Sequence, residues 1–320
     1  MIPSKVHFVW LGDSIPWAYV FAVMSTVARG EVDEVILHHS DPLKDLPATR
    51  ALRETPGVRL APMDGPAWMS SLARHGLPGD RLADIYRRVT NPVARSNMLR
   101  AAAVVDFGGI YLDLDTVTVA SLKPLLNDLQ FVGAEHIAWP HFVRSSKSPL
   151  LWARSGVLDA VRFGLRVLPS GYRWFPAIER AYYLGVNGAI LGGEAGSPFL
   201  CTYLNAMAEV PEEKLLKKHA LGTHLLQQQV DAYRAGDLTV HPPALFYPLS
   251  PEISEHWFRI TPGLNVDPRR ALQPTTRIAH WYASVRTKPV IPKISPEYVR
   301  AHAKEQLYSA LIAEILPQYA

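Results

Sequence analysis

The feature that constrains the fold most strongly is the stretch NPVARSNMLRAAAVVDFGGIYLDLDT, residues 91–116. Asn91 is a favourable N-cap residue, and Pro92 suits the first helical position, where its missing N–H costs no hydrogen bond. The mostly apolar run that follows predicts a buried helix. Gly108 and Gly109 then give the backbone the freedom to leave the helix and reverse direction. The stretch therefore predicts a helix that turns back into a strand.

After the glycine pair, aliphatic and polar side chains alternate. The aliphatic set, expected to face a core, is Ile110, Leu112 and Leu114. Since strand side chains point to opposite faces in turn, Asp113 and Asp115 are expected to share the other face at the strand end. Two carboxylates this close repel each other unless a proton or a cation lies between them. Mg²⁺ and Mn²⁺ take carboxylate and phosphate oxygens as ligands, so the pair predicts a site for a metal diphosphate.

An Asp-x-Asp motif alone is common in loops, and its context decides the interpretation here. It ends an apolar strand, follows Gly-Gly, and is preceded by a helix that carries Arg100. A buried arginine at this place could bind phosphate or sugar hydroxyls in a fork geometry. The alternative is a structural role for Arg100, in which it only pairs with Asp113 or Asp106.

The chain around this stretch predicts an α/β fold. Strands are expected at residues 5–11, 34–39 and 58–61, with helices at 17–29 and 41–54 between them. Strand, helix, strand, helix, strand in this order indicates a largely parallel sheet. Ligands of such sheets bind beyond the carboxyl ends of the strands, which is where Trp10 is expected. An indole there could stack on a nucleotide base, or it could simply belong to the core.

The second half of the chain continues this pattern around an irregular region. Further strands are expected at 131–134, 186–191, 238–241 and 277–283, and further helices at 198–208, 219–235 and 295–320. Residues from about 138 to 180 lose clear periodicity and are rich in Trp, Tyr, Phe, Arg and Pro. We expect them to form a partly helical insertion that serves as a lid or an acceptor-binding region; the alternative is a structural excursion without substrate contact. The whole chain, 1–320, is expected to be one domain.

His280 is the histidine most suited to a role at the metal. It shares a strand face with Ile278 and Tyr282 in the segment RIAHWYAS. Imidazole can complete the coordination of a metal that carboxylates hold. The alternative is a histidine whose hydrogen bonds are satisfied at a strand end.

The composition and net charge limit which ligands, partners and cellular locations are expected. The net charge is +4 and the pI about 9.1, which suits an anionic ligand such as a nucleotide. No basic run interleaved with aromatic residues appears, so nucleic-acid binding is not indicated. The single cysteine, Cys201, excludes an internal disulfide framework. The first residues lack the pattern of a signal peptide and no run is apolar enough to span a bilayer, so we expect a cytoplasmic protein, with attachment to a membrane surface left open.

Several segments together resemble one known family. SNMLRAAAVVDFGGIYLDLD resembles the core motif of the DXD-containing sugar transferases. That family includes capsular polysaccharide transferases, Golgi mannosyltransferases and, more distantly, the glucosyltransferase domain of the large clostridial toxins. Similar to further segments of the family are IPSKVHFVWLG, VNGAILGGEAGSPFL and RIAHWYAS.

The resemblance implies a GT-A-type, Rossmann-like nucleotide-sugar-binding fold with a mainly parallel central sheet and a helical insertion. It implies a hexosyltransferase that depends on Mn²⁺ or Mg²⁺ and retains the anomeric configuration. The donor is a nucleotide-diphosphate sugar, with UDP favoured by the toxin-like HFVWLG. The acceptor is left open among a glycan, as in polysaccharide biosynthesis, a lipid-linked molecule, a small molecule and a protein.

The resemblance also implies roles by position. Trp10 would stack on the base beside the Val9 backbone, Asp113 would contact ribose and sugar, and Asp115 would hold the metal. His280 would lie close to the metal or diphosphate, with Ser284 nearby. The residues expected to line the donor site from the helix are Ser96, Asn97 and Arg100. Two positions depart from the family: Asn97 stands where many relatives have Asp, and Val285 where relatives often have Trp.

No carboxylate outside the motif stands out in the sequence as a nucleophile. This favours a front-face, retaining displacement, and no catalytic base is assigned. Two alternatives remain: a catalytically silent nucleotide-sugar-binding protein, and a metal-dependent nucleotidyl or phosphoryl transferase. The sequence contains no Walker-type loop, which makes the last of these the weaker one.

Overall fold

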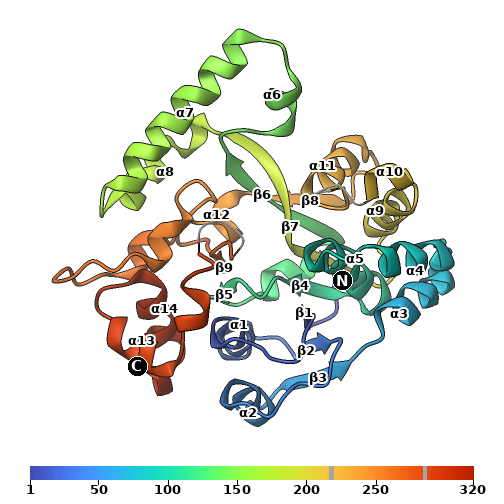
Figure 1. Ribbon diagram of the computed structural model, residues 1–320, viewed down its shortest axis with the longest axis horizontal. Coiled ribbons are helices and arrows are strands. Elements are labelled where there is room, and N and C mark those ends of the chain that lie inside the picture. The colour runs from blue at the N-terminus through green and yellow to red at the C-terminus, as the bar shows by residue number, and fades with distance from the viewer. Residues whose placement is uncertain (216–219, 284–286) are drawn as a thin grey trace.

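A computed structural model describes residues 1–215, 220–283 and 287–320, and it has the predicted α/β architecture. Its central sheet has the strand order β3-β2-β1-β4-β7-β6-β8 (Figure 1). The strands are β1 Lys5–Trp10, β2 Glu34–His39, β3 Val58–Pro62, β4 Gly109–Leu112, β6 Gln130–Ile137, β7 Tyr183–Gly193 and β8 Leu238–His241. Within this described sheet only β7 runs against the others. The predicted mainly parallel sheet is confirmed.

The sheet separates two apolar clusters. The helices of the main body are α1 Trp17–Arg29, α2 Pro47–Glu54, α3 Gly65–Ser71, α4 Gly79–Arg88, α5 Pro92–Phe107, α9 Pro198–Ala208, α10 Glu212–Leu215, α11 Thr223–Ala232, α12 Pro243–Phe246, α13 Pro296–His302 and α14 Leu307–Ile315. Helices α1 and α14 pack in one cluster, while α4, α5 and α9 pack in the other. The alternation in β4 follows this division, since Ile110 and Leu112 enter the first cluster and Tyr111 the second.

Helix α5 and its glycine turn form as predicted. The Asn91 side chain caps the helix by accepting a hydrogen bond of 2.9 Å from the Val93 N–H. The helix ends at Gly108, and Gly109 follows with φ 113°, a conformation that side chains other than glycine rarely adopt. A Cβ at Gly109 would lie 2.7 Å from the Lys5 carbonyl oxygen. The glycine pair therefore lets β4 approach β1 closely.

Some element boundaries and pairings differ from the predictions. The helix predicted from residue 41 begins only at Pro47, because a proline lacking its N–H fits the first helical position there. Helix α11 is shorter than the predicted 219–235, whose first residue lies outside the described ranges. The predicted strand 277–283 is only Ile278–His280 (β9), and it pairs with β5 Thr116–Thr118 in a separate two-stranded sheet. The region 295–320 contains two helices rather than one.

The insertion is helical and lies at one edge of the molecule. It contains α6 His141–Ser145, α7 Pro149–Val167 and α8 Phe175–Ile178, and we call residues 141–181 the arm. Strands β6 and β7 lead into and out of the arm, and α7 extends along its length at the periphery (Figure 1). None of the helices in the described part of the chain combines the length and apolarity needed to cross a bilayer.

A buried histidine pair joins β1 to β2. His7 Nδ1 lies 3.0 Å from His38 Nε2, and His7 Nε2 lies 2.9 Å from the Gly108 carbonyl oxygen. Burial lowers the pKa of His7 to about 4 and that of His38 to about 3. In the unfolded chain both rings would titrate near their ordinary value of about 6.5.

We therefore predict that the free energy of unfolding falls as the pH is lowered from about 6.5 towards about 4. In this window the unfolded chain binds protons that the buried rings do not bind. The lowered pKa of His7 alone corresponds to a loss of about 3 kcal/mol in the free energy of unfolding. Urea denaturation at several pH values measures the slope. His38→Gln should flatten it, whereas His302→Gln on α13 should leave it unchanged. An equal slope in the wild type and His38→Gln would contradict the assignment.

Candidate active site

A turn between β4 and β5 carries the two carboxylates of the motif. β4 ends at Leu112, so Asp113 and Asp115 do not share a strand face as predicted; the chain turns there and brings them together. β9 pairs with β5 in a register that sets His280 opposite Thr116. Asp113, Asp115 and His280 each offer a ligand atom, and these atoms lie within 4.8 Å of one another. The structure thus joins the three residues that were predicted to hold a metal.

Asp113 is held by groups from α5 and β4. Its Oδ1 lies 3.1 Å from Arg100 Nη2 and accepts a hydrogen bond of 2.7 Å from the Tyr111 hydroxyl. The Asp113 N–H donates to the Ala189 carbonyl oxygen at 2.8 Å. Burial raises the pKa of Asp113 and the neighbouring Asp115 adds to this, while the Arg100 guanidinium opposes it. Of the two roles weighed for Arg100, its pairing with Asp113 is observed.

Asp115 is held by the segment that follows β9. Its Oδ1 lies 3.0 Å from His280 Nε2, and its Oδ2 accepts a hydrogen bond of 2.7 Å from the Ala283 N–H. Burial alone would raise the pKa of Asp115, but His280 and the Ala283 N–H outweigh it and the pKa is lowered. Burial likewise opposes the charged form of His280, yet the Asp115 carboxylate raises its pKa. The two acids are therefore electrostatically unequal.

Tyr282 shapes this segment through its backbone. It adopts φ 57°, a left-handed conformation that bulky side chains rarely take. This backbone turn directs the N–H of the next residue, Ala283, to Asp115. The Tyr282 hydroxyl donates a hydrogen bond of 2.8 Å to Glu135 Oε2, and Asn187 Nδ2 donates another of 2.8 Å to the same oxygen. Burial raises the pKa of Glu135 to about 7. The sequence analysis did not single out Glu135, and no local motif marks it.

A cavity of about 340 Å³ opens in front of the carboxylates. It is lined by Val9, Trp10, Leu11, Tyr19, Pro92, Val93, Ser96, Arg100, Tyr111, Asp113, Leu114, Asp115 and Ala283. It lies at the carboxyl ends of β1 and β4, where the sheet order reverses and ligands of α/β sheets bind. Asn97 is buried on α5 and is not among the lining residues. Ser284 and Val285 lie outside the described residues.

Trp10 belongs to an aromatic row at the wall of this cavity. Its ring lies 5.3 Å from that of Tyr19, which in turn stacks on Trp281 at 5.9 Å between centroids. Within the described ranges, the indole Nε1 of Trp10 has no hydrogen-bond partner. Tyr19 was not predicted to be a site residue, because its place in the helical spacing of α1 is the same as that of a core residue. Trp10 is thus packed against Tyr19 and lines the cavity.

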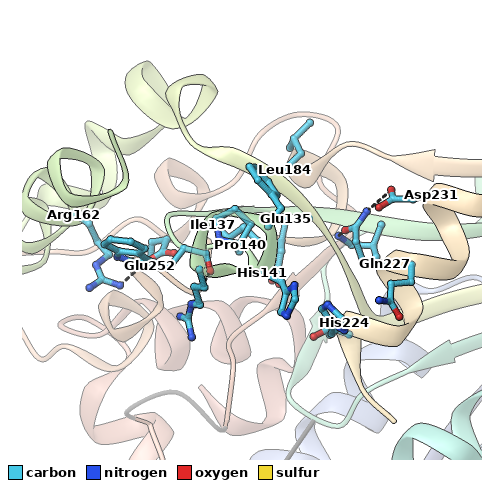
Figure 2. Close-up of a pocket in the computed structure, with 17 residues that line it drawn as sticks. Glu135, Ile137, Pro140, His141, Arg162, Leu184, His224, Gln227, Asp231 and Glu252 are labelled. Carbon is cyan, nitrogen blue, oxygen red and sulfur yellow. Dashed lines mark hydrogen bonds and ion pairs between the residues drawn. The ribbon is translucent and has the colours of Figure 1, made fainter. Parts of the chain in front are cut away.

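A second cavity of about 660 Å³ lies between the body and the arm (Figure 2). Its lining residues come from β6, β7, α6, α7, α11 and the loops beside them: Glu135, Ile137, Trp139, Pro140, His141, Phe142, Arg144, Arg162, Leu184, Gly185, Val186, Thr223, His224, Gln227, Gln228, Asp231 and Glu252. His141 and His224 lie next to each other in its wall (Figure 2), with ring centroids 3.7 Å apart. Glu135 lines this cavity and also accepts a hydrogen bond from Tyr282, whose neighbour Ala283 lines the first cavity.

Residues 50–132 match the family described as the glycosyltransferase sugar-binding region containing a DXD motif. The matched region contains α5, β4 and the Asp113–Asp115 turn. It confirms the resemblance to the DXD-containing sugar transferases for this part of the chain. A comparison with curated protein sequences finds no match.

Solved structures with a similar fold include mouse xyloside xylosyltransferase 1 in its apo form. It is 13% identical with a TM-score of 0.50, over 89% of this chain and 99% of that one. The bifunctional glycosyltransferase WbbM is 12% identical with a TM-score of 0.48, over 98% of this chain, which spans 50% of WbbM. The catalytic domain of the alpha-toxin from Clostridium novyi is more distant, at 11% identity and a TM-score of 0.29 over 75% and 65% of the two chains. The fold is of the GT-A type.

The matched region supports a glycosyltransferase.

The residues of the cluster fit a divalent cation. Two carboxylates and an imidazole form a donor set that Mn²⁺ and, less well, Mg²⁺ accept. In the described part of the chain the second ring nitrogen of His280, Nδ1, has no hydrogen-bond partner although the residue is 4% exposed. Among the residues that the structure describes, Arg100 and His280 are the cationic partners of these partly buried carboxylates.

We predict that Asp115→Asn weakens Mn²⁺ binding by about tenfold or more, because a neutral amide replaces an anionic ligand. Titration followed by electron paramagnetic resonance measures the free ion. The matched control is Asp128→Asn, since Asp128 also pairs with a histidine, His241, at 2.7 Å. The control should bind Mn²⁺ like the wild type. Equal affinities in all three proteins would refute the metal site.

Proposed function

We propose that the protein is a metal-dependent, retaining glycosyltransferase that moves a hexose from a nucleotide-diphosphate sugar to an acceptor. The observation that carries the proposal is the Asp113, Asp115 and His280 cluster at the base of the cavity that Trp10 lines. A nucleotide sugar needs both features at once, an aromatic face for its base and a cationic centre for its diphosphate. UDP is the favoured nucleotide, on the resemblance of HFVWLG to the toxin domains.

In this proposal the donor lies along the first cavity. Trp10 stacks on the base beside the Val9 backbone, and Asp113 accepts hydrogen bonds from ribose and sugar hydroxyls. Asp115 and His280 hold Mn²⁺ or Mg²⁺, which as a Lewis acid stabilises charge on the departing diphosphate. Ser96 lines the same cavity and supplies a hydroxyl for the donor.

Arg100 places a cationic side chain in the lining of the first cavity. Its side chain is buried, and its Nε has no hydrogen-bond partner within the described residues. Because Asp113 holds only one end of the guanidinium, the rest remains free to bind a phosphate or sugar oxygen. We propose that Arg100 stabilises the negative charge that develops as the glycosidic bond breaks.

Retention by front-face displacement agrees with the carboxylates near the site. Asp113 and Asp115 are committed to Arg100 and His280, respectively. Glu135 Oε2 already accepts two hydrogen bonds, from Asn187 and Tyr282. We propose that Glu135 is a positioning residue, which orders the wall between the two cavities and does not attack the sugar.

The acceptor is proposed to bind in the second cavity. Trp139 offers an aromatic face for a sugar ring, and Arg144, Gln228 and Asp231 offer polar groups for its hydroxyls. The α6 segment of the arm forms one wall. Under this proposal residues 138–180 take part in acceptor binding, one of the two roles that we expected for them, the other being a lid.

The test is a hydrolysis screen of UDP- and GDP-hexoses with Mn²⁺ and with a chelator. We expect slow release of UDP from one UDP-hexose, dependent on the ion, and at least about a hundredfold less in Asp115→Asn. Asp128→Asn should match the wild type. Release of pyrophosphate would identify a nucleotidyltransferase instead, and UDP binding without turnover of any donor would identify a silent binding protein.

Trp10→Ala should weaken UDP binding by about 5- to 150-fold, which corresponds to the 1–3 kcal/mol that stacking on a base contributes. Isothermal titration calorimetry in the presence of Mn²⁺ measures the change. The control is Trp174→Ala, which removes an exposed tryptophan of the arm. If both variants bind UDP like the wild type, Trp10 does not contact the base.

A further inference from the structure

The outward face of the arm is apolar, although surface helices normally turn such residues to the core. In α7, Val157 is 64% exposed and Phe163 is 62% exposed. The large hydrophobic residues of the arm that are exposed are Phe142, Leu150, Trp152, Val157, Val161, Phe163, Val167, Leu168 and Trp174. Six of these residues lie on α7, which Figure 1 shows at the periphery of the molecule, and we call them the apolar patch: Leu150, Trp152, Val157, Val161, Phe163 and Val167.

Two arginines of α7 point the other way. Arg162 pairs with Asp159 and, at 2.6 Å, with Glu252 of the body. Arg166 pairs with Glu255. The side chains of these two arginines are only 18% and 23% exposed. These ion pairs attach α7 to the body. The apolar residues of α7 remain exposed and are available to a binding partner.

The arm also carries the positive charge of the protein. Residues 141–181 contain seven Lys or Arg and two Asp or Glu, a net charge of +5 against +4 for the whole chain. The exposed basic residues are Arg144, Lys147, Arg154, Arg173 and Arg180. Both acids of the arm are only partly exposed and have partners, Asp159 with Arg162 and Glu179 with Gln273. The arm, all of which the structure describes, therefore presents cations and no exposed acid around its apolar patch.

We propose that this face of the arm binds the surface of a bilayer containing anionic lipids. Aliphatic and tryptophan side chains that enter the headgroup region, with basic residues around them, are the features of a helix that lies in a membrane interface. A second copy of the chain is the poorer occupant, because apposing the two arms would bring five exposed cations on each side together. The binding requires no transfer reaction and stands apart from the function proposed above.

The test is co-sedimentation of the full chain with vesicles of phosphatidylcholine alone and with vesicles that also contain phosphatidylglycerol. We expect binding to the anionic vesicles that weakens with salt. Val157→Ser with Phe163→Ser should reduce it about tenfold or more. Arg154→Gln and Arg173→Gln should each reduce it about fivefold, since one basic residue near an anionic surface contributes about 1 kcal/mol.

The control is the pair Leu129→Ser and Leu264→Ser, which are 57% and 56% exposed outside the arm. It should bind vesicles like the wild type, and Mn²⁺ affinity should be unchanged in every variant, which checks folding without assaying transfer. No binding to anionic vesicles would overturn the proposal. So would equal loss in the control, or a dimer in analytical ultracentrifugation that Val157→Ser with Phe163→Ser abolishes.

Discussion

The constraint on which the site depends is the partial burial of two carboxylates within one turn. Desolvation and mutual repulsion both disfavour two charged acids so close together. Two basic side chains offset this charge, Arg100 from α5 beside Asp113 and His280 from β9 beside Asp115. These partners make the acids unequal, since the pKa of Asp113 is raised while that of Asp115 is lowered. Asp115 is therefore the better anionic ligand for a metal.

The segment after β9 also links the first site to the second cavity. The segment that delivers His280 continues through Tyr282, whose left-handed backbone directs the Ala283 N–H to Asp115 and whose hydroxyl donates to Glu135. Glu135 lies on β6 and lines the second cavity. The arm forms another wall of that cavity through α6, and its outer side carries exposed apolar and basic residues.

Much of the fold could be predicted from local signals. The Asn91 cap, the glycine pair and the apolar alternation in β4 are each visible in a few consecutive residues, and each is present in the structure. Only Ile278–His280 of the strand predicted at 277–283 is formed, because sequence spacing does not reveal a strand's partner. β9 is short and pairs with β5, outside the main sheet.

The sequence by itself determined the Asp-x-Asp motif, the mainly parallel sheet and the place of Trp10 at a strand end, because these follow from the period within elements and from their order along the chain. Only the tertiary structure decided that Asp113 and Asp115 meet in a turn, and that Glu135 both lines the second cavity and bonds Tyr282. It also decided that α7 turns Arg162 and Arg166 inward and leaves its apolar residues exposed. The physical reason is that ion pairs such as Arg162 with Glu252 join residues far apart in the chain, and no local pattern encodes which face they will take.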